Sequence, residues 1–84
     1  MSQKEKLIEK LKTLPNDFTF SDAETLLRYL EYMRLNKGKT SGSRVMFYRE
    51  GFPPILLHRP HPQKELKQYQ VRQLLEMLEQ EGLI

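Results

Sequence analysis

The fold is decided between residues 43 and 58, which have the sequence Ser43-Arg44-Val45-Met46-Phe47-Tyr48, a turn, and Ile55-Leu56-Leu57-His58. The first run alternates with the period of two that is typical of a strand, and both runs favour strand geometry. If Val45, Phe47, Ile55 and Leu57 face a core, then the residues that alternate with them in this antiparallel hairpin face outward. The hairpin therefore predicts an open sheet face that carries Arg44, Tyr48 and His58.

Helices are expected on both sides of this hairpin. Ser2-Gln3-Lys4-Glu5 is a capping-box pattern ahead of an apolar run that Pro15 ends, which predicts a short first helix. Ser21-Asp22-Ala23-Glu24 is a second such pattern, and it predicts a helix over about residues 22–31. Its apolar stripe consists of Ala23, Leu26, Leu27 and Leu30, and it can extend to Met33.

Residues 32–36 alternate like a further strand, and residues 69–81 have the apolar spacing of a last helix. Gly82 follows that helix and suits the left-handed residue of a C-cap. The expected order is helix, helix, three-stranded antiparallel sheet, helix. This order predicts an α+β protein with a single domain over residues 1–84. Its three-stranded sheet packs on helices, and it has an extra N-terminal helix.

Composition limits the functional classes. The chain has 84 residues and no cysteine, which excludes disulfides, thiolate nucleophiles and cysteine-ligated zinc. No apolar run approaches the roughly 20 residues of a membrane span, so we expect a soluble, cytoplasmic protein without membrane contact. The net charge is +3, yet residues 37–69 hold seven of the 14 cations and only two of the 11 anions. Such a basic segment is typical of polyanion binding, although an ordinary solvated loop can have the same composition.

The residue types in this segment exclude several sites. Gly38-Lys39-Thr40 lacks the upstream glycine of a nucleotide-binding P-loop, and His58 and His61 are too few ligands for zinc. No metal or cofactor is therefore expected. The remaining option is metal-independent cleavage of RNA, in which histidine serves as base or acid and cations stabilise the developing charge. The alternative is that both histidines simply end a strand and a loop.

Four motifs in order resemble the HicA family of bacterial toxins over about residues 3–84. They are Gly42-Ser43-Arg44, His58-Arg59-Pro60-His61-Pro62, Lys64-Glu65-Leu66-Lys67 and the closing Glu81-Gly82-Leu83-Ile84. The resemblance implies a double-stranded-RNA-binding-domain-like fold and a toxin that cleaves messenger RNA. It also implies a HicB-type antitoxin as partner, in a complex that can bind operator DNA.

The sequence departs from this family at position 44, because many members have a catalytic histidine where Arg44 stands. A guanidinium cannot act as a general base near neutral pH, although it can bind phosphate in a bidentate manner. Either His58 or His61 takes the role of the base, or cleavage is weak, or the protein only binds. We favour His58, because the hairpin places it on the face of Arg44.

The sequence thus predicts an endoribonuclease toxin with His58, Arg44 and His61 as catalytic residues. Phosphate and RNA contacts are expected from Lys37, Lys39, Ser43, Arg44, Arg59 and Lys64, with Tyr48 stacking on a base. Two alternatives stay open. One is an RNA- or DNA-binding module that does not cleave, and the other is a protein-interaction domain.

Overall fold

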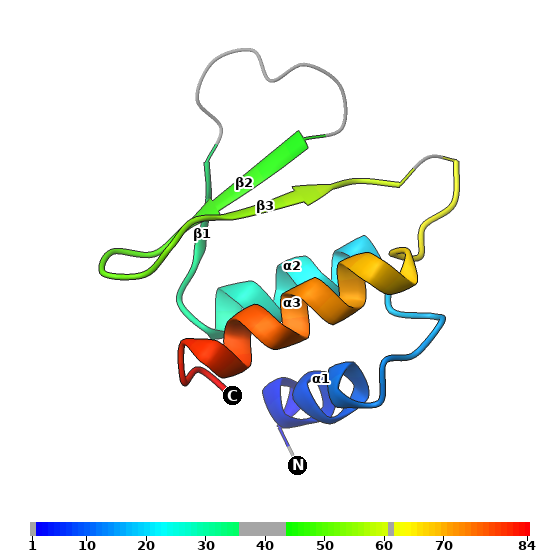
Figure 1. Ribbon diagram of the computed structural model, residues 1–84, viewed down its shortest axis with the longest axis horizontal. Helices are drawn as coiled ribbons and strands as arrows, with labels where there is room; N and C mark the ends of the chain where they lie inside the picture. The colour runs from blue at the N-terminus through cyan, green and yellow to red at the C-terminus, as the bar shows by residue number, and fades with distance from the viewer. Residues whose placement is uncertain (1, 36–43, 61) are drawn as a thin grey trace.

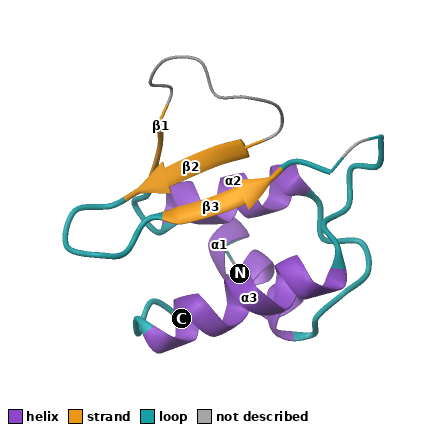
Figure 2. Ribbon diagram, turned by 45° about the horizontal axis from the view of Figure 1, so that its top comes forward, coloured by secondary structure: helices purple, strands orange, loops and turns teal. Residues whose placement is uncertain are grey.

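The computed structural model describes residues 2–35, 44–60 and 62–84. The elements in these ranges are α1 (Gln3–Lys12), α2 (Phe20–Tyr29), β1 (Met33–Leu35), β2 (Arg44–Tyr48), β3 (Ile55–His58) and α3 (Gln68–Gln80), as Figure 1 shows. The strands form one three-stranded antiparallel sheet in the order β1-β2-β3 (Figure 2). The predicted α+β class and sheet are confirmed, and the arrangement is compatible with a double-stranded-RNA-binding-domain-like fold.

One face of the sheet forms part of the core. Val45 and Phe47 of β2 are buried, and so are Ile55 and Leu57 of β3. They pack with the apolar side of α2, where the rings of Phe20 and Phe47 lie 6.4 Å apart between centroids. The alternation in the two runs therefore predicted the buried side of the hairpin correctly.

The helices lie on that buried side. In Figure 1, α2 and α3 lie between the sheet and α1, and α1 contacts both of these helices. Leu7 and Leu11 are the buried residues of α1, and Val71, Leu74 and Leu78 are buried on α3. The opposite face of the sheet is left without a covering helix in the part of the chain that the structure describes.

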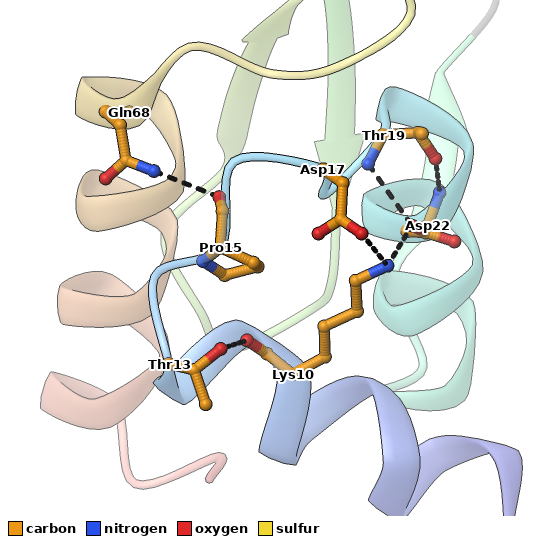
Figure 3. Close-up of polar contacts among 7 residues, drawn as sticks. All are labelled: Lys10, Thr13, Pro15, Asp17, Thr19, Asp22 and Gln68. Atoms are coloured by element: carbon orange, nitrogen blue, oxygen red, sulfur yellow. Dashed lines mark hydrogen bonds and ion pairs between the residues drawn. The ribbon is translucent and has the colours of Figure 1, made fainter.

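The start of α2 corrects one prediction. The helix begins at Phe20 and its N-cap is Thr19, whereas the sequence pattern suggested a cap at Ser21. The Thr19 hydroxyl accepts the Asp22 N–H at 3.0 Å, and the Asp22 carboxylate accepts the Thr19 N–H at 3.2 Å (Figure 3). The earlier start lets Phe20 enter the core, where it is 6% exposed.

Three hydrogen bonds attach the start of α3 and the segment before it to the remainder of the fold. The Phe20 N–H donates to the Lys64 carbonyl at 3.1 Å, and the Leu66 N–H donates to the Phe18 carbonyl at 2.8 Å. The Gln68 amide donates to the Pro15 carbonyl at 3.0 Å, in the turn between α1 and α2 (Figure 3). The chain that follows β3 is thereby fixed against the start of α2.

The end of α3 agrees with the sequence. Gly82 has φ of 72°, in the left-handed region that favours glycine. The Leu83 N–H donates to the Leu78 carbonyl at 2.9 Å, and the Gly82 N–H donates to the Glu79 carbonyl at 3.1 Å. These two bonds form a Schellman motif, so the predicted C-cap is confirmed. Within the described residues, no helix is long and apolar enough to cross a membrane.

Candidate nucleic-acid interface

The uncovered side of the sheet, called here the open face, carries Arg44 and His58 at one end. The strand register makes them direct partners across β2 and β3, and both are exposed. Side chains opposite each other in an antiparallel pair have Cβ atoms about 4.5–5.5 Å apart. The structure thus places Arg44 and His58 together, as the hairpin pattern indicated, while their chemical roles stay predictions.

The remainder of the open face is largely apolar. Tyr48 ends β2, is 45% exposed and pairs with Met33 of β1, which is 70% exposed. This exposure corrects the prediction that Met33 can continue the buried stripe of α2. Between Tyr48 and the Arg44 end lie Met46 and Leu56, which are register partners. At a strand rise of about 3.3 Å per residue, Tyr48 lies about 13 Å from Arg44.

Not all of the predicted phosphate-binding residues belong to this face. Lys37, Lys39, Ser43 and the predicted catalytic His61 lie outside the described residues. Arg59 follows β3, and its Cζ lies 5.0 Å from the centroid of the Phe20 ring, in a cation–π contact. Arg59 and Lys64 line a hollow of about 330 Å³ beside Phe20 at the start of α2. These two cations therefore lie beside the start of α2, outside the open face.

Gln70 of α3 is a residue that the sequence analysis missed. It is 6% exposed, and it is the buried polar side chain of the described core. Its Nε2 donates to the His58 carbonyl at 2.9 Å, and its Oε1 accepts the Lys67 N–H at 2.9 Å. Gln70 therefore holds the backbone of His58 against the start of α3.

A second hollow, called here the His58 hollow, opens where β3 ends. Its volume is about 420 Å³, and it is lined by His58, Arg59, Pro60, Gln63, Lys67, Tyr69 and Gln70. It adjoins a groove of about 270 Å³ between β3 and α3, to which His58, Tyr69 and Gln70 also contribute. His58 thus borders the open face, the His58 hollow and this groove.

The chemistry of these side chains fits an anionic, base-containing ligand. Arginine and lysine bind phosphate oxygens, imidazole transfers protons, and exposed tyrosine rings stack on bases. Among the described residues, no three histidine, aspartate or glutamate side chains come close enough together to hold a metal ion.

Comparison with known proteins identified one family. A family model described as "HicA toxin of bacterial toxin-antitoxin" matches residues 21–83, from the first turn of α2 to the penultimate residue. The search of curated proteins and the search of solved structures found no match. The family match therefore includes β1, β2, β3 and α3 and leaves out α1.

Proposed function

Because the chain belongs to the HicA family, the toxins of bacterial toxin–antitoxin systems, we propose that it is an endoribonuclease that cleaves messenger RNA. A toxin of this kind has a cognate antitoxin as its partner. The observation that carries the proposal is the strand register, which makes Arg44 and His58 neighbours on an exposed face. Messenger RNA as substrate implies that the toxin acts in the cytoplasm.

In the proposed reaction, the His58 imidazole acts as general base and takes the proton of an RNA 2′-hydroxyl. The 2′-oxygen then attacks the adjacent phosphorus, a bond to that phosphorus forms, and the bond from phosphorus to the 5′-oxygen breaks. The 5′-oxygen takes up a proton from an acid, for which His61 is the sequence-based candidate. The products are a 2′,3′-cyclic phosphate and a 5′-hydroxyl, and the reaction needs no metal ion.

Arg44 has the complementary role of a charge stabiliser. Its guanidinium can donate two parallel N–H groups to the non-bridging phosphate oxygens, where negative charge increases in the transition state. It cannot accept a proton near neutral pH, so it does not replace a histidine base. Further phosphates are assigned to Lys37, Lys39, Ser43, Arg59 and Lys64, and a base to Tyr48.

The antitoxin is proposed to cover the same open face. The apolar centre of the open face, around Met46 and Leu56, suits a protein partner. An acidic antitoxin surface would complement Arg44. Bound there, the antitoxin prevents RNA from reaching His58. We propose that operator DNA is bound by the complex of toxin and antitoxin.

The test is incubation of the purified toxin with end-labelled messenger RNA in EDTA, beside a His58→Ala variant. We expect cleavage that leaves cyclic phosphate ends, and a loss of at least about 100-fold in the variant, in line with general-base catalysis. Cleavage by His58→Ala at the wild-type rate would contradict the assignment of the base.

A second candidate function is RNA binding without cleavage, and the arginine at position 44 is the observation that favours it. An Arg44→His variant separates the two functions. If the wild-type protein binds RNA but leaves it intact, and Arg44→His cleaves it, the natural protein is a binding module that lacks its base. If neither protein binds RNA at low salt, a protein-interaction domain is the remaining function.

A further inference from the structure

The His58 hollow is more than a surface depression, because a buried glutamine, Gln70, hydrogen-bonds to two of the segments that line it. Gln70 links the His58 carbonyl to the Lys67 N–H, with both distances 2.9 Å, and is itself 94% removed from solvent at 6% exposure. The last residue of β3 and the segment before α3 are therefore held in a fixed position relative to each other. Side chains on these two segments, which follow each other directly in the sequence, border one site.

The lining of the His58 hollow has the chemistry of a nucleotide site. Arg59 and Lys67 contribute cations, and neither forms an ion pair with a carboxylate in the described part of the chain. Tyr69 is 55% exposed, which leaves part of the residue accessible to a ligand. No aspartate or glutamate is among the described residues that line it. The volume of about 420 Å³ also lies within the range of about 300–1,000 Å³ that is usual for small-ligand sites.

The orientation of Arg59 supports this interpretation. Its Cζ lies over the Phe20 ring, 5.0 Å from the ring centroid, so the cation is held against an aromatic ring. A cation–π contact uses the charge of the guanidinium and does not consume its N–H donors, so these groups can still bind a phosphate. A cation that is held in this way can bind a phosphate at a smaller entropic cost than a freely moving one.

We propose that the His58 hollow is a second nucleotide subsite, which binds the base next to the cleaved bond on Tyr69 and its phosphate on Lys67 and Arg59. The RNA strand then runs from Arg44 on the open face, past His58, into this hollow. The inference rests on the proposed function and adds to it a binding site on the other side of the catalytic histidine. Single-stranded RNA is the required ligand class, because a base in a duplex cannot stack on Tyr69.

The experiment measures the binding of a short single-stranded RNA by fluorescence anisotropy, with a 2′-deoxy substitution at the cleaved bond so that the RNA stays intact. Tyr69→Ala should weaken binding about 5- to 150-fold, whereas Tyr69→Phe keeps the ring and should bind as the wild type does. Lys67→Gln should reduce the slope of log affinity against log salt by about 0.7. Lys6→Gln removes the same charge from the exposed side of α1 and should leave the slope unchanged.

A double-mutant cycle locates the base. An abasic residue is moved along the RNA, and each RNA is measured with the wild type and with Tyr69→Ala. When the missing base is the one next to the cleaved bond, the wild type should bind the abasic RNA more weakly than the intact RNA. Tyr69→Ala should bind the two RNAs equally well, because it lacks the ring on which that base stacks. Additive losses at every position would overturn the subsite.

The outcomes separate this inference from the function on which it rests. If the wild type binds and cleaves RNA while Tyr69→Ala and Lys67→Gln bind it equally well, the subsite is wrong and the nuclease stands. If Tyr69→Ala keeps its RNA affinity and loses only the antitoxin, the hollow is a protein interface and the subsite is again wrong. If the wild type binds no RNA at low salt, the proposed function fails and the subsite fails with it.

Discussion

Gln70 joins the end of β3 that carries His58 to the start of α3, because its single amide bonds to the backbone of both His58 and Lys67. In Gln70→Leu, two polar backbone groups lose their partner, which should lower the free energy of unfolding by about 1–3 kcal/mol. Gln70→Glu keeps an acceptor for the Lys67 N–H, but it replaces the donor to the His58 carbonyl by a second carboxylate oxygen, which that carbonyl repels. We expect both variants to lower kcat more than they raise KM, since the backbone that carries His58 is less well positioned.

Urea unfolding and cleavage kinetics on the same preparations would measure these two effects. Gln73→Leu is the matched control, because Gln73 is an exposed glutamine of the same helix. It should leave both stability and kcat near the wild-type values. Equal kcat for Gln70→Glu and the wild type would rule out a positioning role for Gln70.

The sequence could predict only part of this site. Alternation along residues 44–48 is a local property, so the common face of Arg44, Tyr48 and His58 follows from it and from the hairpin. Lys67, Tyr69 and Gln70 meet His58 through the packing of α3 against the end of β3, which no local pattern specifies. A glutamine beside the apolar stripe of a helix has the same appearance in the sequence whether it is buried or solvated.

At the scale of elements, the start of α2 presents two overlapping capping patterns. Thr19 with Asp22 and Ser21 with Glu24 both have the required spacing of three, and the protein uses the first. Thr19→Ala should therefore lower the free energy of unfolding by about 1 kcal/mol. Ser21→Ala, at an exposed position in the first turn, should change it by less than about 0.5 kcal/mol. Chemical denaturation of the two variants would decide between the caps, and the reverse order of stabilities would contradict the structure.

The strands were more predictable than this helix start. The bounds of β3 equal the predicted Ile55–His58, because Pro53, Pro54 and Pro60 delimit it on both sides. Long-range contacts decide where α2 begins, since Phe20 packs on Phe47 and its N–H donates to the Lys64 carbonyl. Both partners are more than 20 residues away in the sequence, and a window of neighbouring residues contains no information about them.

At the scale of the whole molecule, Tyr32 connects parts of the fold that lie far apart in the sequence. It is 2% exposed between α2 and β1, and its hydroxyl donates to the Pro53 carbonyl in the β2–β3 turn at 3.3 Å. Burial raises the pKa of the Tyr32 hydroxyl, nearby Glu81 raises it further, and Arg49 lowers it. The folded protein consequently holds this proton more tightly than the unfolded chain does.

This shift predicts a loss of stability in alkaline solution. Below a pH of about 10, the ordinary pKa of tyrosine, the hydroxyl is neutral in both states and its contribution to stability is complete. Above that pH the unfolded chain ionises first, and the contribution is lost progressively as the pH rises through the raised pKa of the folded state. Tyr32→Phe should be less stable than the wild type by about 1 kcal/mol at pH 7, because the hydrogen bond to Pro53 is missing.

The difference between the wild type and Tyr32→Phe should then shrink when the free energy of unfolding is measured above pH 10. The test rests on the difference in the free energy of unfolding between the two proteins and not on the absolute value for either one. Tyr29→Phe is the control, because Tyr29 is 46% exposed and its substitution should leave the wild-type pH curve unchanged. A gap between wild type and Tyr32→Phe that stays constant from pH 7 to pH 11 would mean that the Tyr32 hydroxyl titrates alike in both states. In that case the junction of α2, β1 and the β2–β3 turn must admit water to the phenol.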